Sequence, residues 1–564
     1  MKRILLFILC VFSFNMTGCQ NNISTSSSKN NSSSSISKTS DEKLLIEGVD
    51  YVDHSMTFNK GEFIFDESMW YINDLNKVPL PDPHVFFEDG VYYITGTNDY
   101  NEGRTIDCYV TEDFVSYHKI ELYNPARYNG WESVESPQIY APEIYHFGDE
   151  YYLYYSANDN LEKPVRRNSV LVSSNPAGPY RPIQNDKVNG YKEPIFNFDK
   201  TRGLDVTIFQ DDNGDLYMYY VVTEDTQHIV GVKLNSPYEA DWSTRKVLVL
   251  PGTIDSESDE ILLEWETYRE SSLKIAEAPY MIKSNNKYYL TYSVNGCWNK
   301  YYNVCYAVSS SPLGNFVKPY EEGKLWSNLL LGYPGTPDEN DVIYEQWTGF
   351  ASGTGHHCFF NIGEQIMIGY HAHQNRSHND VNKYTERYFA FDYVHFDENG
   401  VPFCNGPTNS IQPLPEELSG FKNIALSADV DGDNVTNIKA INDKYIVDCY
   451  NLDDSNREVI LGNGRSYIDL SFDNEYTIGG VAIYNSAYFG KIIEEIEYID
   501  FGNDNVVYYP QFSKEAYVNN EKSFINPCSA FTIEFPKTFK SNKMVICIDS
   551  SIDCQLNEII VLGQ

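Results

Sequence analysis

The stretch Ile144-Tyr-His-Phe-Gly-Asp-Glu-Tyr-Tyr-Leu-Tyr-Tyr-Ser156 combines an apolar segment, a polar turn and a segment rich in tyrosine. This pattern is typical of a β-hairpin, because aromatic and β-branched residues favour strands while Gly and Asp favour the turn. The pattern occurs four more times, at residues 84–96, 207–220, 280–293 and 358–370. Five copies of one hairpin indicate a fold that is built from five equivalent units.

The spacing of the copies indicates the size of each unit. Their second strands begin near Tyr92, Tyr151, Tyr217, Tyr288 and Ile366, which are 59, 66, 71 and 78 residues apart. Such intervals have room for a four-stranded blade and its loops, whereas a β-sandwich gives no reason for five copies. We therefore predict an all-β protein in which residues 75–412 form a five-bladed β-propeller.

An acidic residue or a histidine precedes the second strand of every copy by 8 to 12 residues: Asp82, Glu143, Asp205, Glu277 and His356. The first strand of a propeller blade lines the central channel, so side chains at equivalent positions are expected to converge on one axis. Aspartate and glutamate together account for 80 of 564 residues, so chance seldom places four acids in such a set. Converging carboxylates repel one another and destabilise an ordinary core, so we interpret the set as a catalytic site.

Two carboxyl groups across a pocket are what the cleavage of a glycosidic bond requires. One must be protonated to donate a proton to the leaving oxygen, and the other must be ionised to activate water. Repulsion within an acidic cluster raises the pKa of at least one member toward neutral pH, which supplies the protonated group. The sequence therefore predicts hydrolysis of a sugar polymer, and a content of 15% aromatic residues suits the binding of sugar rings.

The motifs that carry these residues are, in order, Pro81-Asp82-Pro83-His84, Ala141-Pro142-Glu143, Gly203-Leu204-Asp205, Glu277-Ala278-Pro279 and Gly355-His356-His357. Together they resemble glycoside hydrolase family 43 over roughly residues 75–412. Members of that family are five-bladed propellers that cleave arabinose- and xylose-containing polysaccharides with inversion. The resemblance implies an α-L-arabinofuranosidase or β-D-xylosidase that acts on plant hemicellulose or pectin and requires no cofactor.

The resemblance also implies a role for each residue of the site. Asp82 corresponds to the general base, Asp205 to the residue that orients the acid and tunes its pKa, and Glu277 to the general acid. His356 corresponds to a histidine at the channel centre that often lies near a bound calcium ion. The residues expected to bind the sugar are Tyr140, where the family often has Trp, together with His84, Glu143 and Arg387.

Three nearby glutamates compete with Glu277 for the role of acid, namely Glu264, Glu266 and Glu270. Glu266 is the strongest competitor, but the proline that follows and the position in the blade favour Glu277. Two other functions stay open at this point: a surface protein that binds glycans without turnover, and a five-bladed propeller glycosidase of another family that acts on fructans or galactosides. The sequence does not distinguish arabinofuranosides from xylosides, or exo from endo cleavage.

The N-terminal segment resembles a lipoprotein signal. Lys2 and Arg3 precede the apolar run 4–14, which is too short to span a membrane, and Met16-Thr17-Gly18-Cys19 resembles a bacterial lipobox. We therefore expect residues 1–18 to be a signal peptide and Cys19 to be acylated, with plain secretion as the alternative. Residues 19–45, rich in Ser and Asn, are expected to tether the protein to the extracellular face of a bacterial membrane.

The net charge excludes some classes of partner. The chain has 80 acidic and 42 basic residues, a formal charge of −38, so phosphate backbones and anionic lipids would repel it. We expect no nucleic-acid partner, and membrane contact only through the lipid anchor. The cysteines beyond the signal show no metal-ligand spacing; Cys297 with Cys305, and Cys547 with Cys554, fit either short disulfides or free core residues.

The texture of the sequence changes near residue 421. Short alternating strands follow, such as Tyr467-Ile-Asp-Leu-Ser-Phe472 and Met544-Val-Ile-Cys-Ile-Asp549, and residues 421–564 are enough for one β-sandwich. With Asn423-Ile-Ala-Leu-Ser-Ala428 and Ile478-Gly-Gly-Val-Ala-Ile-Tyr484, these segments resemble a discoidin-like (coagulation factor 5/8 C-type) jelly roll. We therefore expect a discoidin-like β-sandwich at residues 421–564 that either binds sugar or braces the enzyme.

Overall fold

The structure is a computed structural model in which the chain divides into two units, residues 1–44 and residues 45–564. The predicted signal peptide, the acylated Cys19 and the tether lie outside the described residues. The described residues are 50–51, 66–73, 78–197, 202–268, 273–332, 353–373, 387–408, 410–446, 457–486, 491, 493, 495–502, 505–508 and 530–564. In this part of the chain, no helix is both long and apolar enough to span a membrane.

Five antiparallel sheets of four strands follow one another along the chain, and each is a meander in sequence order. Blade one contains β3 (His84–Glu88), β4 (Val91–Thr95), β5 (Ile106–Thr111) and β6 (His118–Tyr123). Blade two contains β7 (Tyr140–Phe147), β8 (Glu150–Asn158), β9 (Arg166–Ser173) and β10 (Arg181–Pro182). Blade three contains β11 (Gly203–Gln210), β12 (Leu216–Thr223), β13 (Gln227–Ser236) and β14 (Glu239–Val249). Blade four contains β15 (Ala276–Ser284), β16 (Lys287–Val294), β17 (Asn303–Ser309) and β18 (Leu329–Leu331), and blade five contains β19 (Gly355–Ile362), β20 (Gln365–His373), β21 (Arg387–Phe396) and β22 (Pro402–Cys404).

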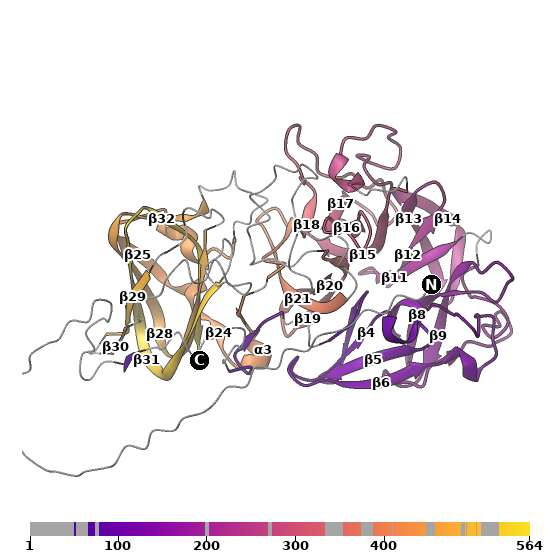
Figure 1. The fold of residues 1–564 in the computed structure, drawn as a ribbon, viewed down its shortest axis with the longest axis horizontal. Helices are drawn as coiled ribbons and strands as arrows, with labels where there is room; N and C mark the ends of the chain where they lie inside the picture. Colours follow the sequence, from indigo (N-terminus) through magenta and orange to yellow (C-terminus); the bar gives the residue numbers. More distant parts are fainter. Residues whose placement is uncertain are drawn as a thin grey trace, which may run out of the picture. The chain divides into compact units, whose positions relative to one another are not determined.

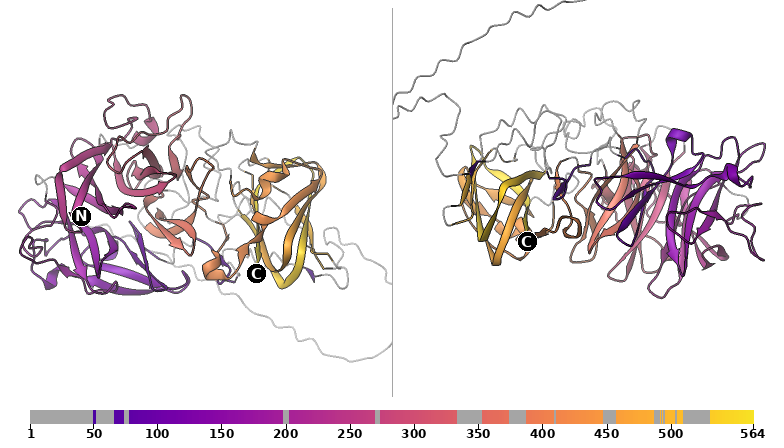
Figure 2. Two further views of the ribbon diagram at one scale, coloured as in Figure 1. Left: turned by 180° about the vertical axis from the view of Figure 1, so that it is seen from behind. Right: turned by 90° about the horizontal axis from the view of Figure 1, so that it is seen from below.

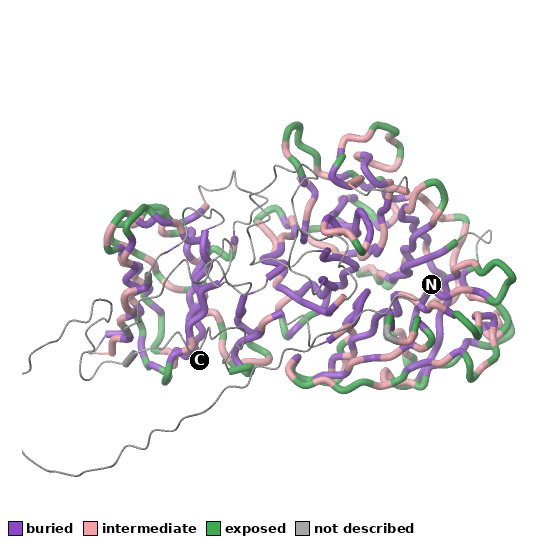
Figure 3. Tube along the Cα trace, viewed as in Figure 1, coloured by how far each residue is buried: buried purple, intermediate pink, exposed green. Residues whose placement is uncertain are grey.

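The five blades close into a ring (Figure 1). Their first strands contact one another in the order β3, β7, β11, β15 and β19, and β19 in turn contacts β3. The second strands of blades two to five are buried over most of their length, while exposed residues gather in loops and turns (Figure 3). The predicted all-β fold with a five-bladed propeller is therefore confirmed.

The start of every first strand has the same backbone irregularity. One residue there has a positive φ: Asp82 (55°), Ala141 (46°), Asp205 (49°), Ala278 (50°) and His356 (46°). In blades two to five the pairing register with the second strand also shifts at this point, as it does in a β-bulge. Bulges redirect the side chains around them, and strained backbone of this kind gathers at functional sites.

The bulges correct one expectation from the sequence, because the five predicted site residues do not occupy equivalent positions. Asp82, Asp205 and His356 are themselves the residues with positive φ. Glu277 comes one residue before that position in its blade, and Glu143 comes two residues after it. The carboxyl groups of Glu277 and Glu143 therefore start from backbone positions that differ from those of Asp82 and Asp205.

The C-terminal region is also built from strands. Ten strands form one hydrogen-bonded sheet: β1 (Asp50–Tyr51), β24 (Lys422–Asn423), β25 (Asp429–Asp433), β26 (Val435–Thr436), β27 (Val459–Leu461), β28 (Gly464–Asn485), β29 (Glu495–Asp500), β30 (Val506–Tyr508), β31 (Ala530–Ser550) and β32 (Cys554–Gly563). The long strand β28 pairs with β25, β31 and β32, and the sheet surrounds an apolar core that includes Ile483, Phe531 and Ile546. Figure 2 shows these orange and yellow strands from two further sides, and the arrangement is consistent with the predicted β-sandwich.

Short elements connect the two β-rich regions along the chain. A two-stranded ribbon pairs β2 (Trp70–Tyr71) with β23 (Gln412–Pro413), and the helix α3 (Glu416–Ser419) follows it. Trp70 and Ile411 are buried in the same apolar core as the C-terminal strands. Single turns of 3-10 helix occur at Asp99–Asn101, Pro125–Arg127, Glu264–Thr267, Ile424–Ser427 and Ile438–Asn442.

The disulfides considered from the sequence are absent from the described residues. No disulfide joins two of the seven described cysteines, and all of them except Cys297 are buried. Cys305 packs in the apolar core of blade four, whereas Cys297 lies in the loop after β16, so the two thiols have different surroundings. The alternative interpretation, that the cysteines are small core residues, is correct for six of the seven.

Candidate active site

Asp82 has a positive φ, lies two residues before β3 and is almost fully buried. Its Oδ1 accepts a hydrogen bond from Arg387 Nη1 at 2.9 Å, and its Oδ2 accepts one from Thr97 Oγ1 at 2.6 Å. His356 Nδ1 lies 3.2 Å from Oδ1, and the Asp82 backbone N–H donates to His371 Nδ1 at 3.1 Å. Blades one and five therefore fix both the carboxylate and the backbone of Asp82.

These partners keep the Asp82 carboxyl ionised. Burial alone would raise its pKa, but the positive charges of Arg387 and His356 outweigh burial and hold the pKa well below its usual range. A carboxylate that is ionised and fixed in this way can accept a proton from water, as a general base must.

Glu277 has the opposite surroundings. It is half-buried at the start of β15 in blade four. Burial, followed by the negative charges of Asp205 and Asp82, raises the pKa of Glu277 to about 7, although His356 opposes the rise. A carboxyl group with this pKa is largely protonated at slightly acidic to neutral pH, as a general acid must be.

Asp205 connects blade three to Glu277. Its Oδ2 accepts a hydrogen bond at 3.1 Å from the backbone N–H of Ala278, the residue that follows Glu277. Burial raises the pKa of Asp205, and the charge of Asp82 adds to the rise while His356 opposes it. Asp205 is thus placed where it can orient the backbone of Glu277 and act on its carboxyl group.

His356 lies among these three acids. Burial lowers the pKa of its imidazole, but the charges of Asp82, Asp205 and Glu277 outweigh burial and raise the pKa to about 9. An imidazole offers a metal ion nitrogen and not oxygen. Within the described ranges no group of three or more His, Cys, Asp and Glu side chains could hold a metal ion, and calcium prefers about six to eight oxygen ligands. These residues do not fit a calcium ion held by His356, and no step below passes through one.

Glu143 and His84 belong to a neighbouring layer of the channel. Each comes two residues after the positive-φ residue of its blade. Tyr145 Oη donates to Glu143 Oε2 at 2.5 Å and lies 2.9 Å from Thr207 Oγ1, while the His84 and Tyr145 rings pack 5.2 Å apart. Burial raises the pKa of Glu143 to about 8 and lowers that of His84 to about 3. Both side chains are mainly uncharged at neutral pH and form part of the channel wall.

Arg387 and Tyr140 lie beside Asp82. The second nitrogen of Arg387, Nη2, donates to the exposed Asp99 Oδ2 at 3.1 Å, so one guanidinium bridges two acids. Tyr140 is half-buried, and the Arg166 guanidinium carbon lies 4.1 Å from its ring centroid. One face of the Tyr140 ring is therefore covered by Arg166.

Three further residues lie near these acids and escaped the sequence analysis: Arg166, Cys297 and Tyr302. Burial raises the pKa of the Cys297 thiol to about 12, and the charges of both Arg387 and Glu277 act on it. Cys297 and Tyr302 lie in the loop after β16, whose residue Ser293 pairs directly with Glu277. Hairpin pairing would have identified this loop, whereas no sequence signal pointed to Arg166.

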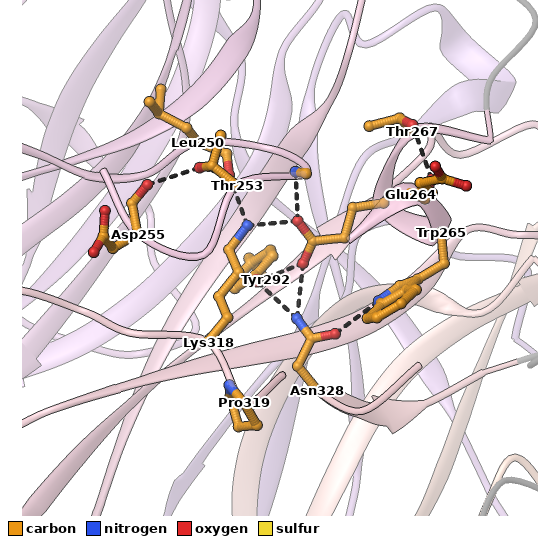
Figure 4. A network of polar contacts seen from close by, with 12 residues as sticks. Leu250, Thr253, Asp255, Glu264, Trp265, Thr267, Tyr292, Lys318, Pro319 and Asn328 are labelled. Carbon is orange, nitrogen blue, oxygen red and sulfur yellow. Dashed lines mark hydrogen bonds and ion pairs between the residues drawn. The ribbon is translucent and has the colours of Figure 1, made fainter. Parts of the chain in front are cut away.

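Glu266, the strongest competitor for the acid, has a structural role instead. It is fully buried in blade four and forms an ion pair with the equally buried Lys318 (Figure 4). Its carboxylate also accepts hydrogen bonds, each at 2.7 Å, from Gly252 N–H, Tyr292 Oη and Asn328 Nδ2. Of the other two competitors, Glu264 is exposed and Glu270 lies outside the described residues.

A glycoside hydrolase requires an ionised carboxylate as base or nucleophile and a carboxyl group of raised pKa as acid, and this propeller site has both. Residues 73–402, more than half of the chain, match the family model of glycosyl hydrolases family 43. The chain belongs to this family, and the resemblance carried by the motifs is confirmed.

Characterised relatives differ in their named substrates. The chain is similar to beta-D-galactofuranosidase xynD of Aspergillus niger, with 24% identity over 356 residues that cover 62% of this chain and 85% of that protein. It is 29% identical to xylosidase/arabinosidase 43A of Humicola insolens over 180 residues, which cover 28% of this chain and 51% of that protein. A solved endo-1,4-beta-xylanase from Bacteroides thetaiotaomicron VPI-5482 aligns with a TM-score of 0.44 and 25% identity, over 60% of this chain and 98% of that one. The names of the first two of these relatives differ in the sugar, so they do not identify the substrate of this chain.

Proposed function

We propose that this family 43 hydrolase cleaves α-L-arabinofuranosyl or β-D-xylosyl linkages of plant polysaccharides with inversion, using Asp82 as base and Glu277 as acid. The observation that carries the proposal is the contrast between the two carboxyl groups. Arg387 and His356 lower the pKa of Asp82 and keep it ionised, whereas burial and neighbouring acids raise the pKa of Glu277 to about 7.

The chemistry then proceeds in one displacement. Glu277 donates its proton to the glycosidic oxygen as the bond from that oxygen to the anomeric carbon breaks. On the opposite face of the sugar, a water oxygen attacks the anomeric carbon and Asp82 accepts the water proton. The products are a sugar of inverted configuration and the released alcohol, and proton exchange with solvent restores both carboxyl groups. Asp205, bonded to the Ala278 N–H, keeps the acid oriented during the transfer.

The experiment is a panel of aryl glycosides, comprising α-L-arabinofuranoside, β-D-xyloside and β-D-galactofuranoside, followed by arabinan, arabinoxylan and xylan. We expect turnover of at least one of the two pentosides, and proton NMR of the fresh product should detect the inverted anomer. Retention of configuration, or a crystal structure with the Asp82 and Glu277 carboxyl groups only about 5 Å apart instead of about 6.5–9.5 Å, would contradict inversion.

β-D-Galactofuranosides are the second candidate substrate. The relative that covers 62% of this chain is a β-D-galactofuranosidase. Its substrate, like an arabinofuranoside, contains a five-membered sugar ring. Faster hydrolysis of the galactofuranoside than of both pentosides would replace the first candidate by the second.

We further infer from the sequence that Cys19 is acylated and that residues 19–45 tether the enzyme to the extracellular face of a bacterial membrane. The lipobox-like motif Met16-Thr17-Gly18-Cys19 supports this localisation. Wild-type protein should take up labelled palmitate and sediment with membranes, and Cys19→Ala should abolish both. Unchanged membrane association of that variant would contradict the anchor.

We also infer that residues 421–564 are a discoidin-like module. Its motifs and its single apolar core support the inference. If this module binds sugar, the full chain should stay on insoluble arabinoxylan even when product fills the active site. A bracing role predicts that product releases the chain.

A further inference from the structure

Two consecutive arginines at the start of β9 have different surroundings, although they share charge and size. Strand geometry points Arg166 and Arg167 to opposite faces of blade two. Arg167 is buried, and its Nε lies 3.3 Å from Asp159 Oδ2. Arg166 is half-buried and stacks on Tyr140, and its buried Nε has no hydrogen-bond partner in the described part of the chain. Only Arg167 therefore has an evident structural task.

The position of Arg166 is beside the acids. The strands β9 and β11 contact each other, and β11 carries Asp205 near its start. The positive charge of Arg166 acts on both Asp205 and Tyr140, and the charges of Asp82 and Arg387 act on the same Tyr140 ring. Arg166 thus lies near both Tyr140 and Asp205.

The two guanidinium groups near the pocket are used differently. Arg387 donates hydrogen bonds to Asp82 and Asp99, and it thereby holds the proposed base in place. An arginine carries five N–H donors and no acceptor, so each donor that is buried without a partner costs free energy. Stacking on Tyr140 holds the Arg166 guanidinium flat and in place while its buried Nε–H stays unsatisfied. A ligand oxygen does not reach the buried Nε, but the side chain as a whole is only half-buried, so the Nη groups are the donors that a ligand would use.

We propose that Arg166 is a substrate-binding residue that donates hydrogen bonds from its guanidinium to hydroxyl or ring oxygens of the sugar held between Asp82 and Glu277. The proposal rests on the proposed function, since it assumes that a glycoside occupies this pocket. It assigns the Tyr140 ring to holding Arg166 in place beside the sugar. The ligand class is a neutral polyhydroxylated ring, because the nearby Asp205 already balances the charge of Arg166.

The test compares Arg166→Met, which keeps the length of the side chain but removes every donor, with Arg166→Lys, which keeps the charge but loses the planar fork. Arg181→Met is the matched control, because Arg181 is an exposed arginine in β10 of the same blade. Kinetics on the best aryl glycoside and calorimetric binding of the released monosaccharide are measured for all variants, with thermal melting as the check on folding. Arg166→Gln, a shorter polar variant, replaces Arg166→Met if the latter melts early.

We expect Arg166→Met to raise KM and weaken monosaccharide binding by about tenfold or more, because an unmade hydrogen bond of a charged donor has an effect of this size. Arg166→Lys should restore the pH profile, through its charge, but not KM or the binding of the monosaccharide. Arg181→Met should match wild type. Wild-type KM and monosaccharide affinity in Arg166→Met, or full rescue by Arg166→Lys, would overturn the proposal and leave Arg166 as a purely electrostatic partner of Asp205. If wild type binds the monosaccharide without hydrolysing any glycoside, the proposed function fails and the binding arm still tests Arg166; if it does neither, both fail.

Discussion

The two carboxyl groups of the site, Asp82 and Glu277, differ in the charges that surround them. Asp82, from blade one, contacts Arg387 and His356, whereas Glu277, from blade four, has Asp205 as its largest charged influence. Burial raises the pKa of both groups, so burial alone would make them alike. Their neighbours decide the outcome: Arg387 and His356 lower the pKa of Asp82, whereas the charges of Asp205 and Asp82 help to raise that of Glu277 although His356 opposes them.

Removing either carboxyl group has the largest expected effect. Asp82→Asn and Glu277→Gln should each lower kcat/KM on polysaccharide by about 10²–10⁴-fold, because each abolishes one proton transfer. On a dinitrophenyl glycoside, whose leaving group needs no protonation, Glu277→Gln should recover much of its rate and Asp82→Asn should not. The exposed Glu264→Gln is the control in the same blade. Equal losses on both substrates would break the distinction between acid and base.

A buried carboxyl group outside the pocket tests the same rule through stability. Lys318→Met leaves Glu266 buried without its cation, and the free energy of unfolding should fall by about 3–5 kcal/mol in urea titrations. Blade two offers the matched control, since Glu132 is also buried but accepts only tyrosine hydroxyls and burial raises its pKa. Glu132→Gln should therefore cost much less. Similar losses for the two variants would show that cation pairing does not govern buried carboxyl groups in this fold.

Removing the cation from the base should make the two halves more alike. In Arg387→Met the pKa of Asp82 should rise, so the acid limb of the kcat/KM profile should move to higher pH, since the base works only when ionised. Activity at neutral pH should fall by about 10²-fold, because Arg387 also holds the carboxylate in position. Arg387→Lys should keep the acid limb low without restoring the bridge to Asp99. An acid limb that stays in place in Arg387→Met contradicts the assignment.

The smallest expected change is a shift on the acid side of the pocket. The charge of Asp205 raises the pKa of Glu277, so Asp205→Asn should move the alkaline limb of the residual kcat/KM profile to lower pH. The pH profile separates this electrostatic effect from the loss of orientation, which lowers the rate at every pH. A shift of the alkaline limb to higher pH would contradict the claim that the charge of Asp205 raises the pKa of Glu277.

The repeats predicted the propeller because each blade carries its own hairpin signal, from Val85 in blade one to Tyr370 in blade five. The motifs also identified Asp82, Asp205 and Glu277, which the structure brings together around His356. The prediction of equivalent positions was wrong where the direction of a side chain depends on a single inserted residue in a bulge. The bulges place Glu143 in another layer, although its spacing from the hairpin resembles that of Asp82.

Two other features of the structure could not be predicted from the sequence. Arg166 and Arg167 are adjacent and identical, so only the pleat of β9 decides which of them reaches the pocket. The spacing of Cys297 and Cys305 allowed a disulfide, but Cys305 lies in the core of blade four and both thiols are free. Such outcomes depend on contacts between strands that are far apart or out of phase, which local patterns do not encode.

The most direct test of the central claim is the pH dependence of kcat/KM for wild type and for the residual activity of Glu277→Gln, measured on an oligosaccharide substrate whose leaving group must be protonated. Glu277 acts while protonated, so wild-type activity should be high on the acid side and decline as pH rises through about 7. The amide of Glu277→Gln does not titrate, so its profile should be flat over the same range. An alkaline limb near pH 7 that persists unchanged in Glu277→Gln would contradict the account.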